Sequence, residues 1–303
     1  MATMAVTGGA GFIGPHLVRA LVREGHRVRV IDNLSAGSRE AVHPDAEFHF
    51  VDIRDGEKLT ALFKGVDSVF HLAALPQVQY SIEHPKETHE VNATGTLNVF
   101  LAATAASVRR VVLASSCAVY GEQLAQPFRE DMTPVPKSPY GLQKYIGERY
   151  ASLFSQLYPL ETVSLRFFNV YGPGQASASA YSMVVSLFAK QKEQGLPLTI
   201  TGDGEQRRDF VHINDVVAAL VGAQRSPKVG KGEVVNIGTG IAVSINELAD
   251  AVGGPRVYIS ARFEPRAACA DIHRAKILLD WEPQVSLSDG MTSLKFRVPV
   301  SVS

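Results

Sequence analysis

The sequence predicts an α/β fold, in which helices cover both faces of a doubly wound parallel sheet and a smaller lobe follows at the C-terminal end. Short apolar segments alternate with helical patterns along the first part of the chain, as they do in proteins with a parallel sheet. A glycine-rich turn separates the first apolar segment from the first helix. From about Gly172 the alternation ends and small polar residues become frequent. We therefore expect one domain over residues 1–170, to which residues 211–237 return, and a second lobe over residues 171–303.

The composition excludes several classes of protein. The chain has 303 residues, and its 30 Lys and Arg balance 30 Asp and Glu, so nothing favours binding to nucleic acid or to an anionic membrane. No apolar run approaches the roughly 20 residues that span a bilayer, and the N-terminus lacks a signal-peptide pattern. Cys117 and Cys269 indicate neither a disulfide framework nor a CxxC metal site. We expect a cytoplasmic protein without a bound metal.

The first apolar segment, Met4–Thr7, predicts a strand, and the turn that follows reads GGAGFIG over residues 8–14. An amphipathic helix comes next. Glycines in this position allow a tight turn and let backbone N–H groups approach a pyrophosphate at the helix N-terminus. Pro15 is compatible with the helix only if it lies in the first turn.

A second predicted strand, Val28–Ile31, ends at Asp32. A carboxylate at this distance from the glycine turn accepts hydrogen bonds from the ribose of an adenosine and repels a 2′-phosphate. The sequence therefore favours NAD over NADP.

Later predicted strands also end at residues that suit a cofactor site. Strand Glu47–Val51 is followed by Asp52, and Ser68–Leu72 by Ala73 and Ala74, whose small side chains let a cofactor lie close to the backbone. A helical pattern then covers 91–106, and 110–114 predicts another buried strand. Because the carboxyl ends of parallel strands meet at one edge of a sheet, these residues predict one ligand crevice.

Tyr140 and Lys144 lie four residues apart at the start of a predicted helix, with Ser138 as its N-cap and Pro139 at its first position. Residues i and i+4 share a helix face, and a cation beside a phenol lowers its pKa from roughly 10 towards neutrality. The pair alone is also compatible with an ordinary surface helix. Ser115 and Ser116, at the end of the preceding strand, either reach the same crevice or satisfy local backbone groups.

The second lobe begins after a strand over 162–168 and a turn over 169–174. A helix over 181–194 and a strand over 198–201 are predicted within it. The C-terminal residues 296–303 show no helical period.

Together these segments resemble the extended short-chain dehydrogenase/reductase family, and most closely its nucleotide-sugar epimerase branch. The resemblance extends from Thr7 to about Met291 and rests on motifs in register: TGGAGFIG at 7–14, DN at 32–33, DI at 52–53, HLAA at 71–74, SSCAVYG at 115–121, YGLQK at 140–144, RFFNVYGPGQ at 166–175, GDGEQRRDFVHINDV at 202–216 and NIGTG at 236–240.

The resemblance implies a Rossmann-type fold and a catalytic triad of Ser116, Tyr140 and Lys144. The cofactor contacts that it implies, besides Tyr140 and Lys144, are Gly8, Gly11, Phe12, Ile13, Gly14, Asp32, Asn33, Asp52, Ile53, Leu72, Ala73, Ala74, Asn92 and Phe168.

In this family the second lobe binds a nucleoside diphosphate, and Asn169, Arg208 and Arg262 resemble the residues that contact it. An arginine fork suits paired phosphate oxygens. The family's Arg-x-Gly-Asp signature is replaced here by Arg262-Phe263-Glu264-Pro265.

The resemblance implies that Tyr140 removes a proton from a sugar hydroxyl while NAD accepts a hydride, so that a 4-keto intermediate can rotate and be reduced on its other face. Dehydratases and decarboxylases of the family carry an acid where this chain has Cys117 or Ala118. A nucleotide-sugar reductase or dehydrogenase and a non-catalytic NAD-binding regulator remain alternatives.

The sugar is predicted from two features. Small Ala268 stands where a bulky tyrosine restricts the family's 4-epimerases to plain hexoses, and 177–181 resembles relatives that tolerate N-acetylhexosamines. We expect a 4-epimerase of UDP-glucose and UDP-galactose that also takes N-acetylated or uronic forms. Relatives dimerise through helices near 92–106 and 140–156, so we expect a homodimer.

Overall fold

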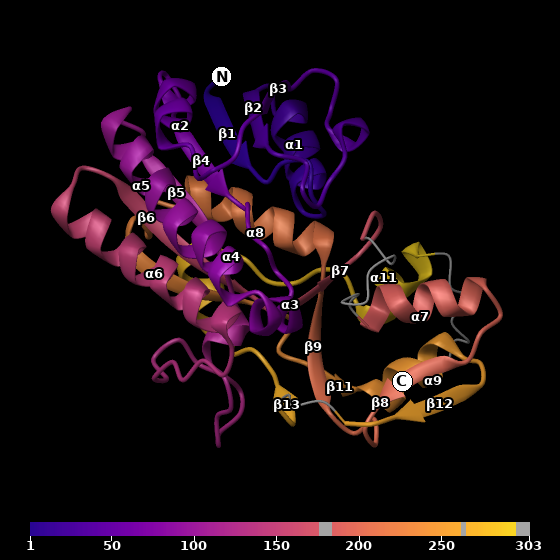
Figure 1. Cartoon of the computed structure of the whole chain (residues 1–303). Coiled ribbons are helices and arrows are strands. Elements are labelled where there is room, and N and C mark those ends of the chain that lie inside the picture. Colours follow the sequence, from indigo (N-terminus) through magenta and orange to yellow (C-terminus); the bar gives the residue numbers. More distant parts are fainter. Residues whose placement is uncertain (176–183, 262–264, 295–303) are drawn as a thin grey trace.

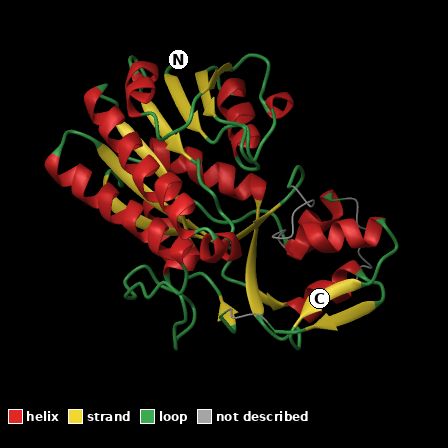
Figure 2. Ribbon diagram, viewed as in Figure 1, coloured by secondary structure: helices red, strands yellow, loops and turns green. Residues whose placement is uncertain are grey.

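The computed structural model describes residues 1–175, 184–261 and 265–294. Its centre is a seven-stranded parallel sheet with the strand order β10-β6-β5-β4-β1-β2-β3 (Figures 1 and 2). The strands are β1 (Thr3–Thr7), β2 (Arg27–Asp32), β3 (Glu47–Phe50), β4 (Ser68–His71), β5 (Arg110–Ser116), β6 (Glu161–Phe167) and β10 (Lys231–Ile237). This architecture confirms the predicted doubly wound α/β fold.

Helices cover both faces of the sheet, and most residues of its inner strands are buried. One face carries α1 (Gly14–Arg23), α8 (Ile213–Arg225) and α10 (His273–Leu279). The other carries α2 (Gly56–Phe63), α5 (Thr96–Ala105) and α6 (Pro139–Leu157). Each layer has its own apolar core.

The strand order reverses between β1 and β4, which is the topological switch point at which α/β proteins bind ligands. The loops that follow these two strands touch. A Cβ atom on Gly8 would lie 2.6 Å from the backbone nitrogen of Ala73. The glycine turn and the loop after β4 therefore lie side by side at the carboxyl edge of the sheet, where the sequence predicts the ligand crevice.

The smaller lobe is built around β9 (Arg207–His212), which pairs with β7 (Asn169–Tyr171), β11 (Ala242–Ser244) and β13 (Ala267–Ala268). Beside it lie the parallel pair β8 (Leu198–Thr201) and β12 (Arg256–Ile259) and the helices α7 (Val184–Glu193), α9 (Ile245–Val252) and α11 (Leu287–Ser293). All of these elements except β12 and β13 contribute to a third apolar core, and the lobe lies at one end of the main sheet (Figure 1).

The chain crosses between the lobes more than once. After β9, helix α8 packs on the main sheet and β10 pairs with β6. Helix α10 also packs against β10 and α8, and Trp281 donates a hydrogen bond to the carbonyl of Asp215 at 2.9 Å. The sequence did not predict this last return.

The predicted helix over 91–106 is confirmed, although its first part is π-helical, over Glu90–Gly95, before α5 begins. Two short helices that the sequence did not predict, α3 (Val78–Glu83) and α4 (Pro85–His89), precede it. A Cβ atom on Gly95 would lie 2.7 Å from Ile53, so the wide π turn and the missing side chain let this segment approach the loop after β3.

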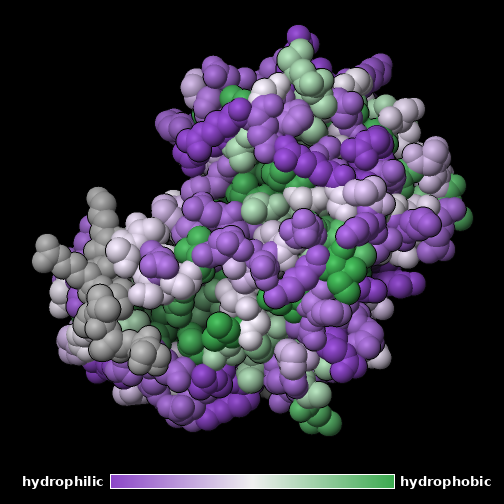
Figure 3. All heavy atoms as spheres, turned by 180° about the vertical axis from the view of Figure 1, so that it is seen from behind, coloured by the Kyte–Doolittle hydropathy of each residue, from purple (hydrophilic) through white to green (hydrophobic). Residues whose placement is uncertain are grey.

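The surface is mostly polar. Seen from behind, hydrophobic residues gather in a hollow of the smaller lobe beside the atoms drawn in grey, and polar residues cover most of the remaining face (Figure 3). Among the described residues, no helix is both long and apolar enough to cross a membrane.

Candidate active site

The amino end of α6 carries the predicted tyrosine and lysine. Ser138 accepts a hydrogen bond from the N–H of Gly141 at 3.1 Å, and Pro139 opens the helix, which confirms the predicted cap. The N–H of Tyr140 donates to the Ser81 hydroxyl of α3 at 3.1 Å. The first turn of α6 is therefore fixed by two buried or half-buried hydroxyls.

The structure brings Ser116, Tyr140 and Lys144 together. A side-chain hydrogen bond joins Ser116 to Tyr140, and the Lys144 ammonium lies 5.9 Å from the centre of the Tyr140 ring. Ser116 also accepts a hydrogen bond from the N–H of Ala118 at 3.1 Å, so it serves both roles that the sequence left open. Lys144 donates to the carbonyl of Ala114, on β5, at 2.8 Å.

Burial controls the acidity of this pair. It raises the pKa of Tyr140 to about 12, against an opposing effect of the Ser116 hydrogen bond. It also lowers the pKa of Lys144 to about 8. The expectation that Lys144 lowers the phenol's pKa is wrong in this arrangement, because loss of solvent has the largest effect on Tyr140 and the Lys144 ammonium is bonded to Ala114 instead.

The glycine turn has the form that a dinucleotide requires. Gly8 has a φ of +71°, and a Cβ atom on Gly14 would lie 2.5 Å from the backbone of Gly9. Gly11, Phe12 and Ile13 lie between them, directly before α1. Pro15 occupies the first turn of that helix, as predicted. At Gly11 an added Cβ atom would meet nothing closer than the Gly8 carbonyl, at 3.4 Å, so the backbone there has room for a close ligand and the residues present fit NAD.

Asp32 is bonded to the same turn. Its carboxylate accepts hydrogen bonds from the N–H of Ala10 at 2.9 Å and from that of Leu34 at 2.7 Å. The side chain therefore shapes the turn as well as presenting a negative charge at the end of β2.

Asn33 and Asp52 meet at the ends of β2 and β3, since the Asn33 amide donates to Asp52 at 2.8 Å. Arg54 donates two further hydrogen bonds to Asp52, at 2.9 and 2.7 Å, and these lower the pKa of Asp52 to about 2. Ile53 is buried and faces Gly95. These three predicted residues thus form one corner of the crevice.

Asn92 fixes the loop that holds Leu72, Ala73 and Ala74. Its amide accepts from the N–H of Leu75 at 2.8 Å and donates to the carbonyl of Leu75 at 3.0 Å. It also donates to Gln143 of α6 at 2.9 Å, and Gln143 donates to Thr88 at 3.0 Å. The hydrogen bonds described for the Asn92 side chain are therefore all made to other residues of the protein.

Phe168 lies differently from the other predicted cofactor contacts. Its side chain is buried in an aromatic cluster, with ring centres 6.3 Å from Phe128 and 6.4 Å from Tyr120. Of Phe168, only the backbone therefore lies near the end of β6.

The predicted substrate residues meet at β9. Asn169 of β7 donates to the carbonyl of Asp209 at 2.9 Å, and Arg208 stands opposite Ala268 in the register of β9 and β13. Ala268 is buried in the aromatic cluster. Arg262 lies outside the described residues.

Sequence reasoning missed several buried polar residues around the site: Ser81, Gln143, Glu148, Arg166, His71 and Asp209. Asp209 accepts hydrogen bonds from Thr239, Gly240 and Ala270, and so fixes β13 beside Arg208. The available signal was position for all but Ser81: the other five lie within a motif already noted or on the helix that carries one, whereas Ser81 lies on α3, outside every motif.

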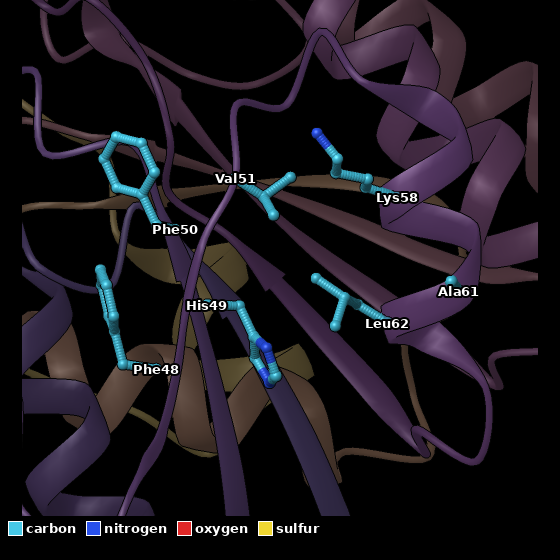
Figure 4. Close-up of a pocket in the computed structure, with 7 residues that line it drawn as sticks. All are labelled: Phe48, His49, Phe50, Val51, Lys58, Ala61 and Leu62. Atoms are coloured by element: carbon cyan, nitrogen blue, oxygen red, sulfur yellow. The ribbon is translucent and has the colours of Figure 1, made fainter.

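A separate pocket of about 360 Å³ lies between β3 and α2 and is lined by Phe48, His49, Phe50, Val51, Lys58, Ala61 and Leu62 (Figure 4). None of these residues belongs to the crevice, and Phe48 and Phe50 project from the opposite side of the strand to His49. Within the described part of the chain, no group of three or more His, Cys, Asp and Glu side chains has a metal-binding arrangement.

The family model described as "NAD dependent epimerase/dehydratase family" matches residues 4–238. A putative UDP-glucose 4-epimerase of Methanocaldococcus jannaschii is 39% identical over 94% of this chain and 95% of its own. The crystal structure of a UDP-glucose 4-epimerase with UDP-glucose from Thermotoga maritima superposes with a TM-score of 0.93 at 36% identity, covering 97% of this chain and 98% of the other.

A second solved structure differs in its ligand. It is a UDP-N-acetylglucosamine 4-epimerase from Methanobrevibacter ruminantium in complex with UDP-N-acetylmuramic acid. Its TM-score is 0.91 at 32% identity, with 97% of this chain and 98% of the other covered.

Proposed function

The chain belongs to the NAD dependent epimerase/dehydratase family, and from this premise we propose that it inverts C4 of a UDP-sugar through a transient 4-keto intermediate. Membership confirms the resemblance drawn from the motifs. The chain is an NAD-dependent epimerase, and therefore an isomerase.

The observation that carries the proposal is the convergence of Tyr140, Ser116 and Lys144 at the carboxyl edge of the sheet, the edge that also carries the glycine turn after β1. Tyr140 takes the proton of the sugar's C4 hydroxyl, and Ser116 hydrogen-bonds the same oxygen. When bound, NAD would supply the hydride acceptor, and its positively charged nicotinamide ring would favour the phenolate. The keto sugar rotates, the hydride returns to the other face of C4 and Tyr140 returns the proton to the oxygen, which inverts C4 with no net oxidation.

Residues 1–170 and 211–237 are the proposed NAD-binding domain, and residues 171–303 are mainly the proposed substrate lobe. Asn169 and Arg208 lie on adjacent paired strands, which supports a shared role in binding the diphosphate. We assign Arg262 to the same group on its resemblance alone. The cofactor contacts proposed are those named from the resemblance, with Asn92 acting through Leu75 and Phe168 through its backbone.

The sugar proposed first is glucose and galactose, as in the M. jannaschii and T. maritima relatives. The small side chain of Ala268 beside Arg208 supports acceptance of an N-acetyl group as well, and the M. ruminantium relative is named for such a substrate. UDP-glucuronate is the third candidate.

A dehydratase is the second candidate, because the same family model includes that reaction. It is disfavoured by Cys117 and Ala118, neither of which can assist elimination. Burial raises the pKa of the Cys117 thiol to about 11, so it stays protonated near neutral pH.

We also propose a homodimer in the cytoplasm. Leu101 of α5 and Leu142, Leu153 and Leu157 of α6 are exposed on the two helices through which relatives were expected to associate. Covering these leucines with a second copy removes apolar surface from water.

To test the proposed function, the purified protein is incubated with NAD and, in separate reactions, with UDP-glucose, UDP-N-acetylglucosamine or UDP-glucuronate. The products are then separated by chromatography. Interconversion without consumption of added NADH supports a 4-epimerase. Stoichiometric NADH consumption would indicate a reductase, and an unchanged substrate in all three cases would refute the proposal.

A further inference from the structure

A buried ion pair lies behind the proposed catalytic lysine. The carboxylate of Glu148, on α6, accepts hydrogen bonds from Arg166 at 2.9 and 2.7 Å and from the Ser115 hydroxyl at 2.5 Å. Both charged side chains are almost fully enclosed, at 2% and 3% exposure. We call Glu148, Arg166 and Ser115 the Glu148 cluster.

The cluster connects three elements of the site. Ser115 is the residue before Ser116 on β5, Arg166 lies near the end of β6, and Glu148 lies one helical turn after Lys144 on α6. Arg166 also stacks 4.5 Å over the ring of Tyr120, so its position is fixed from both sides. The carboxylate therefore has little freedom to move relative to Lys144.

Stability alone does not explain this arrangement. Removing two charges from water costs free energy that their attraction often fails to recover, and apolar pairs of similar size usually stabilise as well. A second pair, Glu161 of β6 with Arg110 of β5, keeps its carboxylate 43% exposed and lies at the other end of the sheet. The enclosed pair is the one beside the reactive lysine.

The charged groups that face Lys144 come from every element packed on it. Its own helix contributes Tyr140 and Glu148, and β4 contributes His71. Burial and the charge of Lys144 lower the pKa of His71 to about 3, so this imidazole is neutral. From β6, Arg166 contacts Glu148. Burial lowers the pKa of Lys144, and Glu148 is the group that opposes this effect.

We propose that Glu148 is a positioning residue, whose carboxylate, held by Arg166 and Ser115, keeps Lys144 charged in a buried site at working pH. The proposal rests on the proposed epimerase function for its catalytic consequence. Its electrostatic part can be measured without turnover.

The test is the Glu148→Gln variant, in which Lys144 is labelled by acetic anhydride over a range of pH and quantified by peptide mass spectrometry. Only the neutral amine reacts. We expect the pH of half-maximal labelling to fall, and labelling near pH 6, where the Lys144 amine of the unchanged enzyme is mostly protonated, to rise by roughly three- to tenfold, since one pKa unit is a tenfold change in the charged-to-neutral ratio. The alkaline limb of the kcat profile should shift to lower pH as well.

Two variants control the experiment. Glu148→Asp retains the charge and should restore the labelling profile of the unchanged enzyme. Glu161→Gln removes a carboxylate from the Arg110 pair at the far end of the sheet, and should leave that profile unmoved even if it lowers the melting temperature. Labelling of Lys144 in Glu148→Gln that matches the unchanged enzyme would overturn the proposal.

If Glu148→Gln fails to fold, the double variant Glu148→Gln with Arg166→Gln removes both charges and leaves no lone buried ion. The unchanged enzyme gives an independent test of the proposal. If labelling shows that its Lys144 is already neutral at pH 6, the proposal is overturned. An inactive enzyme with the expected labelling profiles would refute the epimerase function and leave the role of Glu148 intact.

Discussion

The side-chain amide of Asn92 donates a hydrogen bond to Gln143 at 2.9 Å and so joins the loop after β4 to helix α6. Both backbone groups of Leu75 are bonded to the same amide. The cofactor crevice and the helix that carries Tyr140 are therefore held in one arrangement by two buried amides from segments far apart in the sequence.

Replacing Gln143 by Leu should weaken that connection. Asn92 and Thr88 would each lose a partner in a buried site, which costs about 1–3 kcal/mol for each unsatisfied group. We expect a lower free energy of unfolding in urea and weaker NAD binding in a fluorescence titration.

The control for Gln143→Leu is Gln156→Leu, on the exposed face of the same helix, where the amide bonds only Ser152 among the hydrogen bonds described. This variant should change neither quantity appreciably. Equal effects of the two substitutions would show that the Asn92 connection does not order the crevice.

Gly8→Ala should destabilise the fold and abolish NAD binding. The added Cβ would lie 2.6 Å from the backbone of Ala73, at a φ of +71°. Gly25→Ala is a matched control, since Gly25 has a φ of +81° and nothing within 4 Å. The control should cost about 1 kcal/mol for strain alone, and Gly8→Ala distinctly more. Similar unfolding free energies for the two variants would contradict the contact between the loops.

Asp32→Asn tests the selectivity for NAD. The amide can retain one hydrogen bond to the turn but loses the negative charge that repels a 2′-phosphate, so the ratio of NAD to NADP affinity should fall by about tenfold or more. The exposed Asp45→Asn change should leave the ratio unaltered. A ratio unchanged in Asp32→Asn would show that another group excludes NADP.

The Asp52 ion pair should contribute to stability in a pH-dependent way. Hydrogen bonds from Arg54 lower the pKa of Asp52 from 3.8 to about 2, so its contribution is complete above about pH 4 and is lost as the pH falls to about 2. Asp52→Asn should lower the unfolding free energy by about 1 kcal/mol at pH 7, after allowance for solvent screening. A difference from the unchanged protein that persists undiminished at pH 2 would contradict this.

The sequence was sufficient for the sheet, the glycine turn, Asp32 and the start of α6, because each depends on local patterns: apolar segments, turn glycines and a capping serine. It did not reveal the connection between Asn92 and Gln143, or the ion pair of Glu148 and Arg166. Those contacts arise only when distant segments pack, and no local pattern marks a buried amide or carboxylate.

The acidity of Tyr140 shows a second limit. Spacing places Lys144 on the same helix face, but it cannot show that the ammonium bonds Ala114 or that both groups are buried. The sign of the pKa shift depends on that burial. In the same way, the Phe168 motif matched the family, while its side chain lies in the aromatic cluster with Tyr120 and Phe128.

The most direct test of the account is the rate of interconversion of UDP-glucose and UDP-galactose by Tyr140→Phe, with folding and NAD content checked first. Removing the only atom that Tyr140 offers for proton transfer should lower kcat by about 10²–10⁴-fold while NAD remains bound. A folded, NAD-containing Tyr140→Phe enzyme with the kcat of the unchanged protein would contradict the central claim that Tyr140 is the base.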